Sequence, residues 1–105
     1  MTSGPVRATL KGINHSPRAG KNWYYTLRVS GASGHPLTGT VDVRFVLGEL
    51  VVGHDTPRVH RLRNGVLHEE LTFPAEAIGH GIALQTVVHT SAGSVTLNWP
   101  VNVVR

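Results

Sequence analysis

The stretch Val95-Thr96-Leu97-Asn98-Trp99-Pro100-Val101-Asn102-Val103 decides the fold class of this chain. Apolar residues occupy every second position in it, and polar residues or proline stand between them. Because a β-strand turns successive side chains to opposite faces, this alternation predicts a strand with one buried and one solvated face. Pro100 stands in the polar set and has no backbone N–H to donate. The stretch is therefore expected at the edge of a sheet, where a missing donor is tolerated.

The same period of two recurs along the whole chain. It is found at residues 6–10, 23–29 and 41–47, and less regularly at residues 82–88. No window of helical length shows apolar residues at the spacing i, i+3, i+4 and i+7, and the best helical candidate, residues 74–78, makes one turn at most. The chain is therefore predicted to be all-β.

Turn residues predict how these strands are connected. Asn64-Gly65 is the strongest hairpin signal, because both positions of a tight two-residue turn need a positive φ. Gly48-Glu49 predicts a second hairpin, and Ser91-Ala92-Gly93 a turn between the last two strands. Asp55-Thr56-Pro57 is predicted to break the chain, which separates a strand at 50–52 from another at 59–63.

Strands at this spacing predict a sandwich or a barrel, and we expect a β-sandwich of seven to eight mostly antiparallel strands. The length of 105 residues fits a single domain over residues 1–105, with residues 1–5 expected to be flexible. The chain has no cysteine, so a disulfide framework and thiolate chemistry are excluded. No run of about 18 apolar residues occurs, so no membrane span is predicted, and the first residues do not resemble a signal peptide.

The charge pattern argues against a nucleic-acid-binding protein. Ten Lys and Arg residues against six acids give a net charge of +4, but the cations are spread from Arg7 to Arg105. The one tight group is Arg58, Arg61 and Arg63, and no aromatic residues are interleaved with it as a stacking platform needs. This basic strand is the candidate for binding an anionic polymer.

Seven histidines are the unusual feature of the composition. If the strands simply alternate up and down, the loops that hold His35, His54 with Asp55, and His80 fall at the same end of the sandwich. Three imidazoles and a carboxylate that converge are suitable ligands for Cu or Zn. The alternative, which we favour, is that each histidine is an ordinary polar loop residue and that the protein has no cofactor.

Acid–base and nucleophilic catalysis have no candidate residues. Glu69 and Glu70 are the only adjacent carboxylates, and neighbours on a strand point to opposite faces. The serines lie in turns, and no glycine-rich loop precedes a helix. We therefore expect that the protein is not an enzyme.

Two surface features are candidates for a binding surface. Tyr24 stands on the outward parity of its strand, and together with Val46 it could form an exposed apolar patch. Edge strands offer unpaired backbone groups to a partner or to a second copy. The last strand is protected by Pro100, so residues 6–13 are expected to be the open edge. Trp23 and Trp99, on the apolar parity, are expected to anchor the core.

Three segments resemble bacterial Ig-like domains of the fibronectin-like type. The run from Trp23-Tyr24-Tyr25-Thr26-Leu27-Arg28-Val29 through Gly34-His35-Pro36-Leu37-Thr38-Gly39-Thr40-Val41 is similar to their strand, Gly-x-Pro, strand core. The segments 71–79 and 93–101 are similar to uncharacterised Ig-like domains of exported actinobacterial proteins. The resemblance covers residues 13–104. It implies an Ig-like β-sandwich and an extracellular or cell-surface location, but it identifies no functional residues.

Together these observations predict a non-enzymatic binding or structural module of an exported or surface protein. A cytoplasmic location stays open, as do two alternative functions. One is a Cu- or Zn-binding domain that uses the loop histidines, and the other is a domain that binds an anionic polymer through its basic strand.

Overall fold

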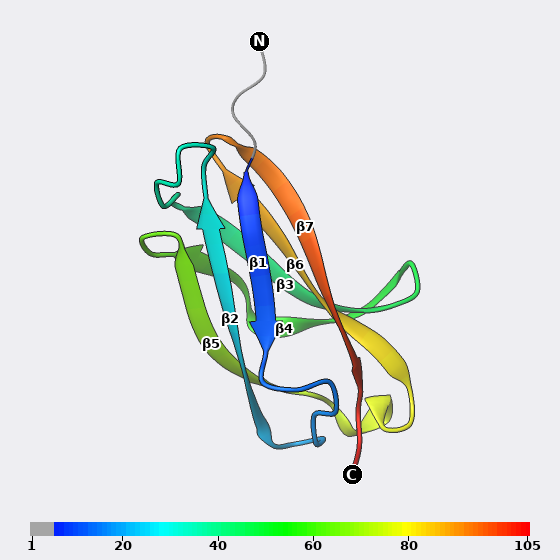
Figure 1. Cartoon of the computed structure of the whole chain (residues 1–105). Helices are drawn as coiled ribbons and strands as arrows, with labels where there is room; N and C mark the ends of the chain where they lie inside the picture. The colour runs from blue at the N-terminus through cyan, green and yellow to red at the C-terminus, as the bar shows by residue number, and fades with distance from the viewer. Residues whose placement is uncertain (1–5) are drawn as a thin grey trace.

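The computed structural model describes residues 6–105, apart from the side chains at positions 56 and 57, and it forms two antiparallel sheets packed face to face (Figure 1). Its elements are β1 (Arg7–Gly12), β2 (Asn22–Ser30), β3 (Gly39–Leu47), β4 (Leu50–Leu62), β5 (Val66–Thr72), the 3-10 turn η1 (Ala75–Ala77), β6 (Gly81–Thr90) and β7 (Gly93–Asn102). The expectation for residues 1–5 lies outside the described residues. The predicted all-β sandwich of seven to eight mostly antiparallel strands is confirmed.

The chain changes from one sheet to the other after β2, after β4 and after β5. One sheet has the order β1-β2-β5 and the other β4-β3-β6-β7. The alternating residues predicted to be apolar and inward make the core between them. In β2, for example, Trp23, Tyr25, Leu27 and Val29 are each at most 2% exposed. The core is therefore formed by the faces that the sequence period indicates.

Both predicted hairpin turns are confirmed. Arg63 and Val66 exchange backbone hydrogen bonds of 3.1 and 3.0 Å across Asn64-Gly65, whose φ values are 51° and 71°. Gly48, with a φ of 62°, begins the two-residue turn between β3 and β4. Glycine adopts these positive φ values at little cost, which is why the turns form at these positions.

The predicted chain break at Asp55-Thr56-Pro57 is wrong. Residues 50–62 form the single strand β4, in which His54 stands opposite Arg44 and Val59 stands opposite Asp42. Four residues, 55–58, thus stand opposite the single residue Val43, and the strand bulges irregularly there. A bulge tolerates a proline because the extra residues do not pair with the neighbouring strand. The described chain has seven strands rather than eight. Every loop after β4 therefore lies at the end of the sandwich opposite to the one that simple alternation of the strands predicted.

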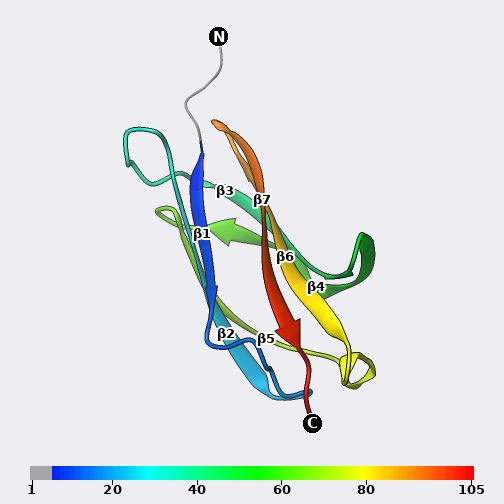
Figure 2. The same cartoon turned by 45° about the vertical axis from the view of Figure 1, so that its right-hand side comes forward.

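The predicted edge position of Pro100 is also confirmed. It lies in β7, the last strand of its sheet, opposite Ala83. The connection between β1 and β2 crosses to β7 and covers its end, where Asn102 donates its N–H to the His15 carbonyl at 2.8 Å. β1 is the edge of the other sheet and contacts β7 (Figure 2).

Candidate functional site

The structure does not bring the four predicted metal ligands together. His35 lies in the connection between β2 and β3, and His80 lies between η1 and β6. These two segments stand at opposite ends of the sandwich (Figures 1 and 2). The prediction placed them at one end because it counted eight strands, and the continuous β4 removes one reversal of the chain.

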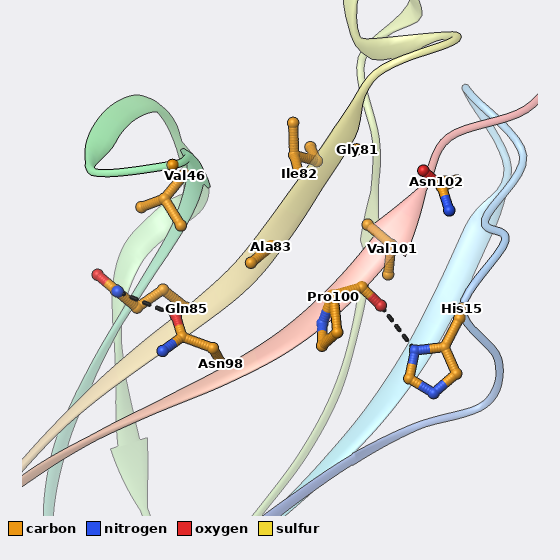
Figure 3. Close-up of a pocket in the computed structure, with 11 residues that line it drawn as sticks. His15, Val46, Gly81, Ile82, Ala83, Gln85, Asn98, Pro100, Val101 and Asn102 are labelled. Atoms are coloured by element: carbon orange, nitrogen blue, oxygen red, sulfur yellow. Dashed lines mark hydrogen bonds between the residues drawn. The ribbon is translucent and has the colours of Figure 1, made fainter.

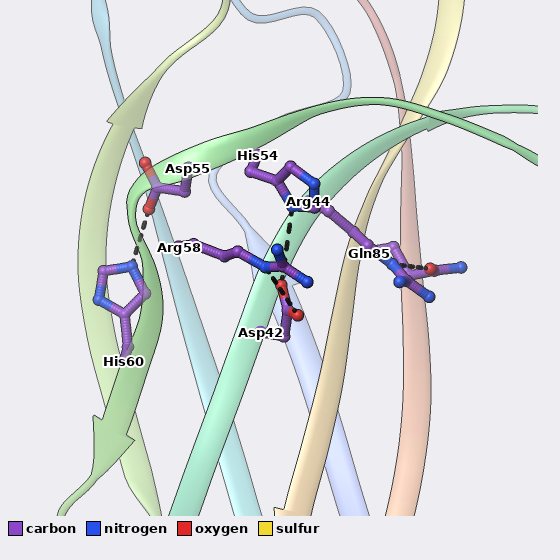
Figure 4. Close-up of polar contacts among 7 residues, drawn as sticks. All are labelled: Asp42, Arg44, His54, Asp55, Arg58, His60 and Gln85. Carbon is purple, nitrogen blue, oxygen red and sulfur yellow. Dashed lines mark hydrogen bonds and ion pairs between the residues drawn. The ribbon is translucent and has the colours of Figure 1, made fainter.

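His54 and Asp55 lie in the middle of β4 rather than in a loop, and their side chains have different partners (Figure 4). Nδ1 of His54 is 3.9 Å from Oδ1 of Asp42, whereas Oδ2 of Asp55 is 2.9 Å from Nε2 of His60. Within residues 6–105, no group of three or more His, Cys, Asp or Glu side chains is placed to hold a metal ion. The converging metal site predicted from the loops is therefore wrong in its geometry.

The Asp55–His60 pair lies in the protein interior, close to a buried tyrosine. Its two side chains are about one-tenth exposed, and Tyr25 is buried. Burial, and next the negative charges of Asp55 and Glu69, raise the pKa of the Tyr25 hydroxyl well above its usual range. The tyrosine therefore stays neutral. We interpret Asp55, His60 and Tyr25 as part of the packed interior rather than as a reactive site.

The three arginines of the basic strand do not act as one free positive group. Arg58 donates from Nε to Oδ2 of Asp42 at 3.2 Å, and the same carboxylate faces His54 (Figure 4). Arg61 is exposed near the end of β4, and Arg63 is exposed just after the strand ends. An anionic polymer on this strand would compete with Asp42 for Arg58.

The expected patch of Tyr24 and Val46 does not exist. Tyr24 lies on the outer face of β2 and is 41% exposed, whereas Val46 lies in β3 of the other sheet and is buried. The outer faces of two packed sheets point away from each other, so these side chains stand on opposite sides of the molecule. The alternation along a strand predicts whether a side chain points outward or inward, but it does not predict which sheet the strand belongs to.

A different apolar surface is exposed at the turn between β3 and β4. Four large apolar side chains lie there, and we call them the hairpin patch: Leu47, 43% exposed, Leu50, 64%, Val51, 38%, and Val52, 51%. The turn extends beyond the body of the sandwich in Figures 1 and 2. The sequence did contain a signal for it. Leu50-Val51-Val52 is an unbroken apolar run, so a strand there presents apolar side chains on both of its faces.

A groove of about 410 Å³ lies beside the hairpin patch. Leu47 and Val52 line it from the hairpin side, and Pro74, Ala77 and Ile82 are among the residues that line it from the η1 segment and β6. Its ionisable residues are Glu76 and His80. We call it the apolar groove. Leu47 and Val52 belong to both, so the groove continues the apolar surface on one face of the hairpin, whereas Val51, opposite Val46 in the register, lies on the other face.

A larger hollow of about 630 Å³ lies over β6 and β7, and Figure 3 shows most of its lining. Its polar groups already pair with the protein: Gln85 accepts from Nε of Arg44 at 2.6 Å and donates to Asn98 at 3.0 Å. Nδ1 of His15 donates to the Pro100 carbonyl at 2.6 Å, and its ring stacks on Trp99. These pairs leave few free groups, so the smaller apolar groove is the better candidate site.

Comparisons with known proteins support the fold alone. No family model and no curated protein matches the chain. The chain is similar to a crystal structure of an engineered protein, with a TM-score of 0.58 and 13% sequence identity. The match covers 94% of this chain and 20% of the engineered chain, so this chain spans about one fifth of that protein's length.

Over residues 6–105, no helix is both long enough and apolar enough to cross a membrane.

Proposed function

We propose that this chain is a non-enzymatic protein-binding module and that the hairpin patch and the apolar groove form its binding site. The observation that supports this most directly is the exposure of four large apolar side chains within one short hairpin. Contiguous apolar surface of this kind on a soluble domain is typical of a site that another protein covers.

The chemistry of the site favours a polypeptide as the ligand. The groove accepts apolar side chains such as those that anchor protein interfaces. The neighbouring strand β4 is the last strand of its sheet and offers backbone groups to an extended segment. A small polar ligand or an anion would find only Glu76 and His80 as ionisable groups in the groove.

An exported or cell-surface setting belongs to the same proposal. It is supported by the resemblance of residues 13–104 to bacterial Ig-like domains, which serve as spacers, adhesion modules and assembly subunits. The alternatives of metal binding and of anionic-polymer binding have less support, because the four ligands are dispersed and Asp42 already pairs with Arg58.

Selection from a displayed peptide library on the immobilised protein tests this proposal. We expect apolar peptides, and we expect the variant Leu50→Asp with Val52→Asp to weaken their binding about tenfold or more, because burial of each side chain contributes about 1.5–3 kcal/mol. Fluorescence anisotropy with a labelled peptide measures the change.

Val59→Asp is the matched control. Val59 lies in the same strand and is 49% exposed, but it is outside the hairpin patch. Its variant should bind the peptides as the wild type does. Equal binding by all three proteins, or a loss that is the same at Val59 and at the hairpin, would contradict the proposed site.

A further inference from the structure

The first half of β4 has an open edge. β4 is the last strand of its sheet, and residues 50–54 pair with β3 on one side only. In a two-residue hairpin the closing pair, here Leu47 and Leu50, exchanges its backbone hydrogen bonds. Hydrogen-bonded and non-bonded pairs alternate along a ladder, so the N–H and C=O of Val51 point to the open side. Across residues 6–105, no backbone hydrogen bond beyond the β3 ladder reaches them.

This edge lacks two of the features that usually prevent strand addition, charge and proline, and its one irregularity is the shift in the β3–β4 register at Val52. The run Leu50-Val51-Val52-Gly53 contains no charge and no proline. The other three edges are protected: β1 carries the exposed Arg7 and Lys11, β5 carries the exposed His68 and Glu70, and β7 carries Pro100 under the covering connection. An apolar, uncharged edge that protrudes from the molecule is the feature that most favours pairing with another strand.

The charges at the two ends of the segment favour a second copy of this chain as the partner. Glu49 and His54 flank the apolar run, and both are exposed. When two such segments pair antiparallel, the Glu49 end of one copy lies beside the His54 end of the other. Apolar residues then face apolar residues, and at both ends the Glu49 carboxylate comes near the His54 imidazole, which also faces Asp42 of its own copy.

We propose that β4 of one copy pairs antiparallel with β4 of a second copy over residues 49–53, with the two Val51 residues opposite each other, so that two four-stranded sheets join into one of eight strands. The contact uses the same segment twice about a two-fold axis, so it closes into a dimer and does not grow into a filament. This inference rests on the proposed binding site and names its partner.

Sedimentation velocity over a wide range of concentrations tests the proposal. The wild type is expected to approach twice the monomer mass of 11.3 kDa as its concentration rises. Val51→Pro removes the outward N–H without removing a bond to β3, and Val51→Lys adds a charge at the edge. Each should raise the dissociation constant about tenfold or more. Val59→Lys, the control, should leave it unchanged.

Single cysteines give a second measurement, because the natural chain has none. Val51→Cys places a cysteine on the two-fold axis, where facing strands bring Cβ atoms to about 4.5–5.5 Å. Val51→Cys is expected to form a disulfide-linked dimer under mild oxidation, whereas Val59→Cys should stay monomeric. This readout does not depend on the folding of the proline variant.

A wild type that stays monomeric at every concentration would overturn the dimer. The same is true of a dimer that Val51→Pro and Val51→Lys leave unchanged. If the monomer still binds the selected apolar peptides through Leu50 and Val52, the dimer alone is wrong and the site is bound by a different protein. If peptide binding is also absent, the proposed function fails as well.

Discussion

At the scale of single residues, Asn14 holds two tryptophans of opposite sheets. Its side-chain oxygen accepts from Nε1 of Trp23 at 3.1 Å and from the N–H of Ser16 at 3.0 Å. Its backbone carbonyl accepts from Nε1 of Trp99 at 2.9 Å. Trp23 is buried in the core as expected. Trp99 is only partly buried, and His15 stacks on it with the ring centroids 4.2 Å apart.

Replacement of Asn14 tests this arrangement. Asn14→Ala leaves the part-buried Trp23 Nε1 without its acceptor, which costs about 1–3 kcal/mol in the free energy of unfolding. The hydrogen bond of Trp99 is retained, because it is made to the backbone. Urea unfolding measures the change, with Asn22→Ala, at an exposed position, as the control. Equal stability of the two variants would show that the Asn14 side chain is dispensable.

Tyr25 gives the second prediction at this scale. Its hydroxyl is buried and, among the described residues, has no hydrogen-bond partner. Loss of an unsatisfied buried hydroxyl is nearly neutral or stabilising, so Tyr25→Phe should unfold at an equal or higher urea concentration at neutral pH.

The pH dependence of this variant follows from the raised pKa of Tyr25. Above a pH of about 10 the unfolded chain loses the tyrosine proton while the folded protein keeps it, so stability falls as pH rises. Below that pH the stability that the raised pKa of Tyr25 contributes is fully present. Tyr25→Phe should therefore lose less stability than the wild type in alkaline urea titrations. Tyr24→Phe, which changes an exposed hydroxyl, should follow the wild type, and a Tyr25→Phe curve parallel to it would refute the assignment.

At the scale of elements, both hairpin turns contain a glycine with a positive φ, but the two glycines have different surroundings. Gly48 has a φ of 62° and no atom close to where a Cβ would stand, whereas a Cβ on Gly65 would be 2.3 Å from the Val29 carbonyl oxygen. Val29 also donates its N–H to the Gly65 carbonyl at 2.7 Å. The turn at Gly65 thus packs against the neighbouring β2 strand, and the turn at Gly48 stands free.

Alanine substitution at the two glycines should separate the cost of a positive φ from the cost of the contact with Val29. Gly48→Ala should destabilise the fold by about 1–2 kcal/mol, the cost of a positive φ for a residue with a Cβ. Gly65→Ala should cost about a further 1–3 kcal/mol, because the backbone must move to relieve the contact. Thermal and urea unfolding of both variants measure the difference. Equal losses would mean that the contact with Val29 relaxes without cost.

At the scale of the whole molecule, the last residues tie the C-terminal end of the chain to two segments that are distant in sequence. Val103 is buried, and its carbonyl accepts from the Gly79 N–H at 3.0 Å. Val104 donates to Pro17 and accepts from Ala19, each at 2.9 Å. These bonds link the C-terminal end to the connection between β1 and β2 and to the segment before β6.

Deletion of residues 103–105 should therefore be severe. The loss of one buried valine and three backbone hydrogen bonds amounts to about 4–6 kcal/mol, which is comparable to the whole stability of many small domains. Far-UV circular dichroism and urea unfolding measure it. Deletion of Arg105 alone should change little, and a 103–105 deletion that unfolds like the wild type would disprove the role of this segment.

Much of the fold could be predicted because its signals are local. The alternation in residues 95–103 and the Asn64-Gly65 turn depend on neighbours along the chain. The proline at position 57 was also a real signal, but a local rule does not distinguish the end of a strand from a bulge within one. That single ambiguity misplaced His80 relative to His35, and with it the predicted metal site.

The sequence by itself determined the fold class, the inward faces of the strands and the edge position of Pro100, since backbone geometry imposes a period of two and a proline cannot donate. Only the tertiary structure decided which sheet each strand joins and which residues meet in space. Tyr24 and Val46 were separated, and Asp55 was paired with His60 inside the protein. The exposure of Leu50 and Val52 was decided in the same way, because burial depends on the elements that the whole chain brings to a face, and no element covers this hairpin among the described residues.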